Sequence, residues 1–453
     1  MKVKEITHLL EDVEEGTAFV VIRGRTFDNS GDVPEALRRG ATLLITPERL
    51  PYDVPQIVAE DTRRAALKLS DEVYPDWRKV RVVGITGTNG KTTTAFLLRH
   101  ALERLGERVA LVGTVIWDDL HGEREARLTT PEAFYLRRIL GRAARKGGRF
   151  AVMEVSSIGL VQGRVEGIDF AVGVLTNVGW DHIDYHGSFE EYLRAKTLLF
   201  RKSGVSLINA DDPNARAFIS SARGEVFTYG RGRGDFPFSV LSESAEGTVV
   251  EVKGREIRTR LLGDFNAYNL TAAFASAVLL GFPEDEVAGA LKGVGGPPGR
   301  LERVFSGPFH VFVDYAHTPD AIDRVLSVLR PYARRLITVF GAGGNRDRGK
   351  RPEMARAVER WSDVAVLTSD NPRWEDPMAI IEEVRRGFVS LEPVVIPDRR
   401  EAIRRALSLA GEGDIVAILG KGHERYQEVE GHRLPFDDVA VARDILKDMG
   451  ALG

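Results

Sequence analysis

Cysteine is absent from the 453 residues of this chain. Its absence excludes disulfide bonds, thiolate nucleophiles and zinc sites built from cysteine. Charge of one sign is also scarce, since 63 Lys and Arg residues nearly balance 66 Asp and Glu residues and leave a net charge of −3. So small a net charge gives no long-range attraction to nucleic acid or to an anionic membrane, so an anionic ligand must be bound at a local site.

Long apolar runs are missing as well. A membrane-spanning helix needs about 18 or more consecutive apolar residues, and the sequence contains no such run. The N-terminal stretch MKVKEITHLLEDVEEG carries charges throughout and no apolar h-region, which is unlike a secretory signal. We therefore expect a cytoplasmic protein, monomeric by default, with neither nucleic acid nor membrane among its partners.

Apolar strand-like runs alternate with helical patterns along the whole chain, which is typical of α/β folds with largely parallel sheets. At roughly 150 residues per domain, the length suggests about three domains. The charged, Pro-containing stretch 74–79 is predicted to be a linker, and the Gly- and Pro-rich stretch 293–300 marks a second boundary. The predicted domains are a small N-terminal α/β domain over 1–79, a central α/β domain with a mostly parallel sheet over 80–299, and a C-terminal doubly wound α/β domain over 300–453.

Several strands are predicted from their apolar runs. In the central part they are expected at 81–86, 150–155, 171–176 and 205–209, before an irregular β-rich stretch over 225–259 and a helix that begins near Asn266. The last third contains five strand-like runs that each end in a polar or glycine-rich loop: HVFVDYA, RRLITVFGAGG, DVAVLTSDNPR, EPVVIPD and DIVAILGKGHE. In a doubly wound sheet, ligands bind beyond the carboxyl ends of the strands.

The stretch VVGITGTNGKTTTAFLL, residues 82–98, reads as a buried strand, a glycine-rich turn and a helix. Glycines let backbone amides approach a phosphate, Lys91 adds a positive charge, and Thr92 can reach magnesium at the helix N-terminus. The strict pattern G-x-x-x-x-G-K-[ST] is not met, because Ile85 stands at the first glycine position and Gly87 makes the early turn. The alternative is a glycine-rich connection without a ligand. The predicted nucleotide-phosphate residues are Gly87, Thr88, Asn89, Gly90, Lys91, Thr92 and Thr93.

Acidic and imidazole side chains follow two of the predicted strands. Glu154 ends one strand, and Asp181 and His182 closely follow the next. Oxygen ligands with one imidazole at strand ends suit Mg²⁺ beside a triphosphate. An acid at a strand end is, taken singly, more often a helix cap, but the neighbouring phosphate loop favours a metal site.

Further motifs occur in order along the chain: GTNGKTT, LGDFNAYNLTAA, GRLE, DYAHTPD, GNRDRGKRP, SDNPR and GKGHE. In this combination the chain resembles the Mur ligases over essentially its whole length, most weakly in the first 80 residues. The resemblance implies an ATP-dependent acid–amino-acid ligase of peptidoglycan precursor synthesis, with ATP and Mg²⁺ as cofactors. It also implies that the N-terminal domain binds the UDP substrate, that the central domain is a P-loop ATPase-type domain, and that the Rossmann-like C-terminal domain binds the amino acid. Such an enzyme converts a carboxylate into an acyl phosphate and exposes it to an amine, chiefly by positioning and by neutralising charge.

The resemblance also implies roles for single residues. Lys91, Lys196 and His182 would be catalytic, and the metal ligands would be Thr92, Glu154, His182 and Lys196, the last if carbamylated. By itself Lys196 reads as an ordinary exposed helix lysine. Asn269, Arg300 and Asp314 would contact the base and ribose of ATP, and otherwise read as a helix-surface residue, a linker charge and a turn former.

The acyl substrate implied by the resemblance is UDP-MurNAc-L-Ala-D-Glu. Its polar, anionic sugar–peptide part is expected to contact Thr129, Thr130, Ser156, Gln162 and Arg164. Two places depart from the family pattern. Leu9, Leu10 and Glu11 stand where a D-S-R motif is usual, so no uridine contacts are assigned, and Ile158 stands where relatives usually carry histidine.

The added amino acid is the sharpest question of specificity. A site for meso-diaminopimelate must bind a distal carboxylate and ammonium, which calls for an arginine fork and an acidic partner. The residues implied for this pocket are Arg346, Asp370, Asn371, Arg373, Gly420 and Glu424. The alternatives are L-lysine or L-ornithine as the added amine, and Asn-Pro-Arg as an ordinary turn with a solvated Arg373.

Other functions stay open at this point. Ligases that add D-glutamate, D-Ala-D-Ala or glutamate to folate are disfavoured by the DNPR and GKGHE stretches. A P-loop ATPase or switch that joins nothing would hydrolyse ATP without an amino acid. A nucleic-acid-binding ATPase is disfavoured by the balanced charge.

Overall fold

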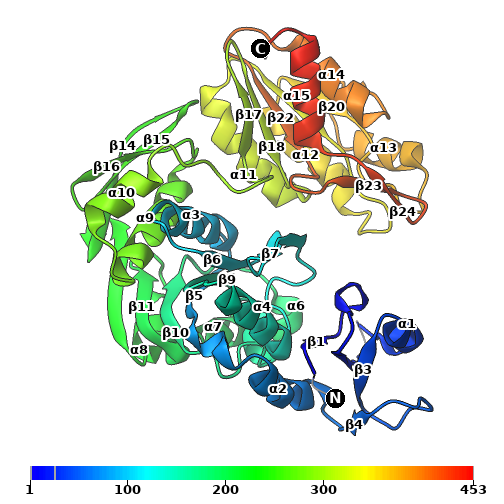
Figure 1. The fold of residues 1–453 in the computed structure, drawn as a ribbon. Coiled ribbons are helices and arrows are strands. Elements are labelled where there is room, and N and C mark those ends of the chain that lie inside the picture. The colour runs from blue at the N-terminus through cyan, green and yellow to red at the C-terminus, as the bar shows by residue number, and fades with distance from the viewer. Residues whose placement is uncertain (1–2, 25–26, 452–453) are drawn as a thin grey trace. The chain divides into compact units, whose positions relative to one another are not determined.

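The computed structural model (Figure 1) describes residues 3–24 and 27–451. The chain divides into two compact units. The first unit runs to Phe238 and includes Tyr268–Ala290. The second unit contains Ser239–Ala267 and begins again at Leu291. The fold is α/β with mostly parallel sheets, as the alternation of the sequence predicts. None of the helices in the described ranges has the length and apolar character that crossing a bilayer requires.

The N-terminal part of the first unit is a small parallel sheet with strand order β1-β2-β3-β4. The strands and helices of this part are β1 (Glu5–Thr7), η1 (Leu10–Asp12), β2 (Thr17–Val20), η2 (Ser30–Asp32), α1 (Val33–Arg38), β3 (Ala41–Thr46), β4 (Gln56–Val58) and α2 (Thr62–Val73). Asp61 occupies the N-cap position of α2, where its side chain accepts a hydrogen bond from the Arg64 amide.

The stretch predicted to be a linker is a packed 3-10 helix, η3 (Pro75–Lys79). Tyr74 is 0% exposed and Trp77 only 3% exposed, and the Arg137 guanidinium lies 4.5 Å above the Trp77 ring. The prediction of a linker here is wrong. The charged residues and the proline suggested an exposed connection, but two large aromatic side chains of this stretch are buried within the first unit. The division into three domains at residues 79 and 299 stays a prediction.

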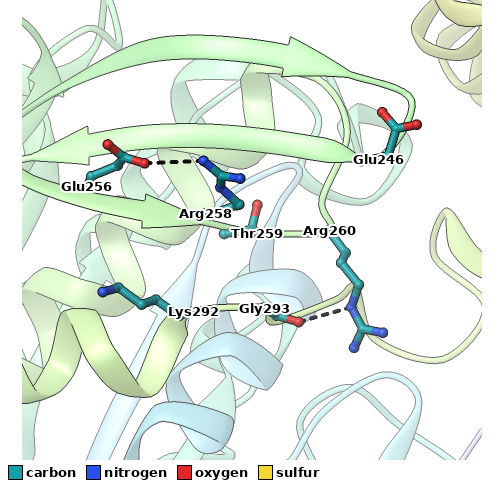
Figure 2. A pocket seen from close by; sticks show the side chains of 7 residues that line it. All are labelled: Glu246, Glu256, Arg258, Thr259, Arg260, Lys292 and Gly293. Carbon is teal, nitrogen blue, oxygen red and sulfur yellow. Dashed lines mark hydrogen bonds and ion pairs between the residues drawn. The ribbon is translucent and has the colours of Figure 1, made fainter.

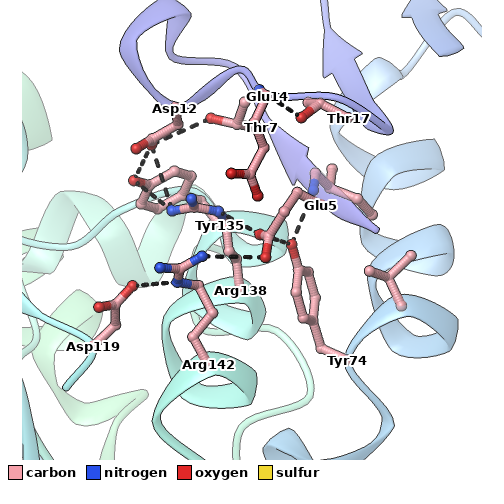
Figure 3. Close-up of polar contacts among 12 residues, drawn as sticks. Glu5, Thr7, Asp12, Glu14, Thr17, Tyr74, Asp119, Tyr135, Arg138 and Arg142 are labelled. Atoms are coloured by element: carbon pink, nitrogen blue, oxygen red, sulfur yellow. Dashed lines mark hydrogen bonds and ion pairs between the residues drawn. The ribbon is translucent and has the colours of Figure 1, made fainter. Parts of the chain in front are cut away.

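A buried ionic network joins this small sheet to the helix α4 (Ala133–Arg145) (Figure 3). Glu5 on β1 accepts from Arg138 Nε at 2.9 Å, from the Tyr74 hydroxyl at 2.7 Å and from Arg142 Nη1 at 3.2 Å. Arg142 also donates to Asp119 at 2.6 Å. Opposite charges therefore meet where the two parts of the first unit pack.

The larger sheet of the first unit has β5 near its centre, in the order β14-β12-β11-β10-β5-β9-β6-β7-β8. It is parallel from β14 to β6, and β7 and β8 are antiparallel at one edge. Its strands are β5 (Arg81–Thr86), β6 (Val109–Val112), β7 (Ile116–Asp118), β8 (Glu123–Glu125), β9 (Phe150–Glu154), β10 (Phe170–Leu175), β11 (Ser203–Asn209), β12 (Glu225–Arg231) and β14 (Phe236–Ser244), which continues into the second unit. The two-residue strand β13 (Arg233–Gly234) lies between β12 and β14 in the chain. Strands covered on both faces favour unbroken apolar runs, which is why the four expected strands are confirmed within one or two residues.

Helices connect these strands. Besides α4 they are α3 (Lys91–Arg104), α5 (Ser157–Val161), α6 (Ile183–His186), α7 (Phe189–Thr197), η4 (Phe200–Lys202), α8 (Ala215–Ser221), α9 (Asp264–Leu279) and α10 (Glu284–Leu291). The helix expected near Asn266 is α9.

The second unit contains a six-stranded sheet with order β17-β18-β22-β19-β20-β21. Five strands are parallel and correspond to the five predicted runs. β17 pairs antiparallel with β18 and was not predicted, because its short sequence ERVFS begins with two charged residues. The elements of this unit are β15 (Gly247–Val252), β16 (Arg255–Arg258), β17 (Glu302–Ser306), β18 (His310–Asp314), α11 (Pro319–Leu329), η5 (Arg330–Tyr332), β19 (Leu336–Phe340), α12 (Lys350–Trp361), β20 (Val364–Leu367), α13 (Pro377–Arg385), β21 (Val394–Val395), α14 (Arg399–Leu409), β22 (Ile415–Leu419), β23 (Tyr426–Val429), β24 (His432–Pro435) and α15 (Asp438–Asp448).

Candidate active site

The loop between β5 and α3 is held tightly against the turn that follows β10. Gly87 and Gly90 have φ values of 153° and 85°, which favour glycine. A Cβ at Gly87 would overlap the Thr176 hydroxyl, and a Cβ at Gly90 would overlap the side-chain amide of Asn269. The Thr88 amide donates to Asn177 O at 2.8 Å. The loop is therefore a preformed backbone turn at the start of a helix, the place where an anion binds best.

Two lysine side chains meet at this loop. Lys91 Nζ donates to Gly87 O at 2.9 Å and to Thr88 O at 3.0 Å, and Lys196 Nζ from α7 donates to the same Gly87 O at 2.9 Å. Lys196 is only 2% exposed, so its interpretation as an exposed helix lysine is wrong. Burial, with a smaller effect of the Lys91 charge, holds the pKa of Lys196 well below its ordinary value.

Glu154, at the end of β9, faces the first turn of α3. Its Oε2 accepts from the Thr92 hydroxyl at 2.9 Å and from the Thr114 hydroxyl at 3.0 Å, and its Oε1 accepts from the Thr114 amide at 2.8 Å. The helix-cap alternative for Glu154 is wrong, because the cap of α5 is Ser156, whose hydroxyl accepts from the Gly159 amide. A buried carboxylate thus lies beside the hydroxyl expected to reach magnesium.

Four of the five residues expected to contact the acyl substrate lie along the same network. Thr129 Oγ1 is 3.1 Å from Thr114 Oγ1, and Thr130 Oγ1 donates to Glu154 O at 3.0 Å and lies 3.2 Å from Ser156 Oγ. Arg164 Nη1 donates to Thr130 O at 2.9 Å. Gln162 instead donates to the Tyr185 hydroxyl on α6, at 3.0 Å. Hydroxyls and a guanidinium therefore extend from the phosphate loop along one edge of the sheet.

His182 contacts other residues than Glu154 does. Its Nε2 is 3.5 Å from Asp181 Oδ2, and its side chain is 49% exposed. Within the described ranges, no three His, Cys, Asp or Glu residues form a group that could hold a metal ion. Mg²⁺ commonly takes only one or two protein carboxylates and completes its shell with phosphate and water, so this arrangement fits a metal bound together with a nucleotide.

The three residues expected to contact the nucleoside are divided between the units. Asn269 belongs to the first unit, is 3% exposed and accepts from the Thr94 hydroxyl at 3.3 Å, so it is not a helix-surface residue. In the second unit, Asp314 ends β18 and accepts from the amides of Leu301 at 2.7 Å and Ala316 at 2.8 Å. Burial raises the pKa of Asp314. The Arg300 guanidinium lies 5.1 Å from the centre of the Tyr315 ring.

The residues expected to bind the added amino acid gather at the carboxyl ends of β20 and β22. Asn371 Nδ2 donates to Glu424 Oε2 at 2.9 Å. A Cβ at Gly420 (φ 117°) would stand 2.8 Å from Asp370 Oδ2, so this glycine permits the close approach of the carboxylate. Lys421, which sequence reasoning left out, contacts all three polar side chains.

Arg373 is fixed rather than solvated. Its Nε donates to Glu428 Oε2 at 3.0 Å and its Nη1 to Gly344 O at 2.7 Å. The position of a Cβ at Gly343 lies 3.1 Å from Arg373 Nη1 and 3.9 Å from Arg346 Cγ, so both arginines flank one glycine. The alternative of an ordinary turn with a solvated arginine is wrong.

A separate surface pocket of about 610 Å³ lies in the second unit, beside β16 (Figure 2). Its lining residues are Glu246, Glu256, Arg258, Thr259, Arg260, Lys292 and Gly293. None of the residues that line it is a predicted site residue.

Comparison with known proteins decides the family. The family model described as "Mur ligase middle domain" matches residues 85–277, and "Mur ligase, glutamate ligase domain" matches residues 299–422. A protein of Aquifex aeolicus named UDP-N-acetylmuramoyl-L-alanyl-D-glutamate–2,6-diaminopimelate ligase is 42% identical, and the match spans 100% of this chain and 95% of that protein. The chain belongs to the Mur ligase family. A Geobacillus kaustophilus protein of the same name is 40% identical over 97% of this Mur ligase and 94% of its own length.

Solved structures agree with this assignment. A structure titled as the same 2,6-diaminopimelate ligase has a TM-score of 0.67 and 34% identity, covering 99% of this Mur ligase and 95% of that chain. MurF from Acinetobacter baumannii has a TM-score of 0.72 over 98% of this chain and 94% of its own, and at 19% identity it shows the shared fold alone.

Two contact residues of this Mur ligase were missed in the sequence. Lys421 stands inside the GKGHE stretch, between two residues that were predicted, so the motif itself was the available signal. Thr114, which binds both oxygens of Glu154, follows β6 in the plain sequence LVGTV and offered no motif.

Proposed function

We propose that this Mur ligase adds meso-diaminopimelate to the D-glutamyl residue of UDP-MurNAc-L-Ala-D-Glu at the expense of ATP. The observation that carries the choice of amine is the fixed Arg373 beside the Asn371–Glu424 pair. Diaminopimelate ends in a carboxylate and an ammonium, and a guanidinium and a carboxylate are their ordinary partners. The names of the relatives at 42% and 40% identity support the same choice.

The loop of residues 87–93 is proposed to bind the phosphates of ATP, and the ammonium of Lys91 is proposed to turn toward them. The ammonium of Lys91 now rests on the carbonyls of Gly87 and Thr88, which a phosphate oxygen would replace as hydrogen-bond acceptors. Asn269, Arg300 and Asp314 are proposed to contact the base and ribose.

Mg²⁺ is proposed to be held by Thr92 and Glu154, with His182 and a carbamylated Lys196 as further ligands. The buried Glu154 carboxylate and the adjacent Thr92 hydroxyl are hard oxygen donors of the kind this ion prefers. When bound, the ion would neutralise phosphate charge.

Lys196 fits the proposed carbamylation. Its lowered pKa favours the neutral amine, whose lone pair can attack the carbon of CO₂. The new N–C bond forms as one C–O double bond opens and the amine loses a proton, which leaves a carbamate with one negative charge. Burial beside Lys91 places that negative charge next to a positive one.

In the proposed reaction, an oxygen of the D-glutamyl side-chain carboxylate attacks the γ-phosphorus of ATP, and ADP leaves. Thr129, Thr130, Ser156, Gln162 and Arg164 would hold and orient the acyl substrate. The amine of diaminopimelate then attacks the acyl carbon, the amide bond forms and phosphate departs with the bonding electrons, while the amine loses a proton. Positioning and charge neutralisation supply most of the rate in such phosphoryl chemistry.

The test is phosphate release from ATP in the presence of UDP-MurNAc-L-Ala-D-Glu, with meso-diaminopimelate, L-lysine or L-ornithine in separate reactions and the products weighed by mass spectrometry. A tripeptide product with diaminopimelate alone supports the proposal. A product with lysine or ornithine alone contradicts the choice of amine, and phosphate release that ignores the amine contradicts ligation. The proposed setting is the cytoplasm, where ATP is the energy source, and the proposed state is a monomer.

A further inference from the structure

Lys421 is a fully buried cation at the carboxyl edge of the sheet in the second unit. Its side chain is 0% exposed. Its Nζ donates to Asn371 Oδ1 at 2.8 Å, to Glu424 Oε2 at 3.2 Å and to Asp370 Oδ1 at 3.5 Å. An ammonium has three donor hydrogens, so these three acceptors use its full capacity.

The three acceptors come from two loops that the sheet does not bring side by side. Asp370 and Asn371 follow β20, whereas Lys421 and Glu424 follow β22, and β19 lies between these strands. The side chain of Lys421 therefore joins the loops over the carboxyl end of β19.

Glycines after β19 make room for this connection. A Cβ at Gly341 would stand 2.3 Å from Thr368 O, and one at Gly344 would stand 1.9 Å from Pro372 O. The backbone that carries Asp370 and Asn371 thus packs directly on the glycine-containing loop that follows β19.

The contacts of Lys421 also set the orientation of its neighbours. Because an ammonium only donates, the Asn371 oxygen must face it, and the same oxygen accepts from the Glu428 amide at 2.9 Å. The Asn371 amino group then points to Glu424 Oε2, which Lys421 contacts as well. Both contacts use Oε2, so Oε1 is the oxygen of Glu424 that can accept from a substrate ammonium.

The local charge favours such a ligand. Two carboxylates, Asp370 and Glu424, face the single ammonium of Lys421, whereas the nearby Arg399 is bound to Asp438 at 2.7 Å. The cluster of Lys421, Asp370 and Glu424 therefore carries one excess negative charge, which an incoming ammonium would balance.

We propose that Lys421 is a positioning residue for the added amino acid, which presents the carboxylates of Glu424 and Asp370 to an ammonium group of the diamino substrate. This role rests on the proposed function. Lys421 would not touch the reacting atoms, and its effect would reach the substrate through the geometry of Glu424.

The test replaces Lys421 by an apolar side chain of similar length, K421M, and measures each substrate separately. We expect the KM for meso-diaminopimelate to rise at least about tenfold, while the KM values for ATP and for UDP-MurNAc-L-Ala-D-Glu change less than about twofold. Acyl-phosphate formation, trapped as the hydroxamate with hydroxylamine and without diaminopimelate, should keep its wild-type rate. K421R, which restores the charge, should recover part of the affinity. The matched control is K447M, since Lys447 is an exposed lysine on α15.

The outcomes separate this role from the alternatives. An unchanged KM for diaminopimelate in K421M overturns the proposal, and so does an equal loss of hydroxamate formation and ligation, which marks a purely structural residue. If K421M does not fold, K421Q takes its place, because its amide can still donate to Asn371, and the same criteria apply. Wild-type protein that makes no product with diaminopimelate contradicts the proposed function itself, whereas wild-type activity with an unaffected K421M contradicts only the role of Lys421.

Discussion

The Thr92 hydroxyl donates to Glu154 Oε2 over 2.9 Å and so joins the first turn of α3 to the end of β9. β9 pairs with β5, the strand that leads into the phosphate loop. A carboxylate, a hydroxyl and the loop are therefore placed together by the register of two adjacent parallel strands, the arrangement that ligand sites in such sheets require.

Lys91 is the first residue of this site to test. K91A should lower ligation at least about a hundredfold, because the variant loses a preorganised charge aimed at the transferred phosphoryl group. The fold should persist, since the side chain is only half-buried and bonds to carbonyls of its own loop. Product formation and the thermal transition of K91A are compared with those of K68A, an exposed lysine on α2. Turnover unchanged from wild type would remove Lys91 from the phosphate site.

Lys196 should carry a carbamate. Protein incubated with ¹³C-bicarbonate is expected to show a carbamate carbon resonance that K196M lacks and that K146M, changed at an exposed lysine, keeps. Removal of dissolved CO₂ should lower ligation by the wild-type enzyme, and bicarbonate should restore it. The physical basis is the neutral amine that burial favours at Lys196. Activity that is indifferent to CO₂, with no such resonance, would contradict the modification.

Sequence patterns identified the elements that depend on local signals. The strand at 81–86 agrees with β5 because a run of apolar, β-branched residues marks a strand buried on both faces. The glycines of the phosphate loop also predicted its tight turn correctly, because residues other than glycine rarely adopt φ values of 153° and 85°. Both features depend on residues that are close together in the sequence.

Features that depend on distant residues were not legible. Lys196 reads as an exposed helix lysine until α7 packs against the phosphate loop more than a hundred residues earlier. Tyr74 and Trp77 are hidden in a charged stretch whose partners, Glu5 and Arg137, lie on other elements. Burial of this kind arises from tertiary packing, which local composition does not encode.

His8 should make the first unit sensitive to acid. It is 5% exposed among the rings of Phe27, Phe134 and Tyr135, and burial lowers its pKa to about 3 despite the opposing effect of Asp12. Arg127, Arg63 and Arg164 lower the pKa further. The unfolded chain takes up this proton near pH 6.5, so the stability that neutral His8 contributes is complete above that pH and is lost as the pH falls toward 3.

The measurement is the free energy of unfolding by urea at pH 7.5 and pH 5 for the wild type and H8F. Between these pH values the wild type should lose about 2 kcal/mol more than H8F, which has no proton to bind. H432Q, changed at an exposed histidine, should follow the wild type. Parallel losses in wild type and H8F would show that His8 is not the titrating group.

Arg138 should be essential to the junction between the small sheet and α4. Arg138 is 3% exposed, and its Nε donates to Glu5 Oε2 at 2.9 Å (Figure 3). R138M removes the shortest arginine contact of the buried Glu5 carboxylate, whereas Arg142 at 3.2 Å and the Tyr74 hydroxyl remain, so the first unit is expected to lose about 1.5–3 kcal/mol of stability. E5Q combined with R138M should regain part of that loss, because the carboxylate that needs these partners is then neutral. Urea unfolding checks both, with R104M at an exposed site as control, and a loss in R138M no larger than in R104M would contradict the role.

Arg373 should determine which diamino acid is accepted. Glu428 and Gly344 O fix two of its nitrogens, so the remaining one can meet a distal carboxylate in a constant geometry. L-lysine lacks that carboxylate. R373M should therefore lower kcat/KM for meso-diaminopimelate at least about tenfold, as expected for loss of a charge-assisted hydrogen bond, while kcat/KM for L-lysine stays low and unchanged. R385M, changed at an exposed arginine on α13, serves as the control. A fall of equal size for both amino acids would mean that Arg373 supports the pocket without reading the carboxylate, because only a direct contact distinguishes the two substrates.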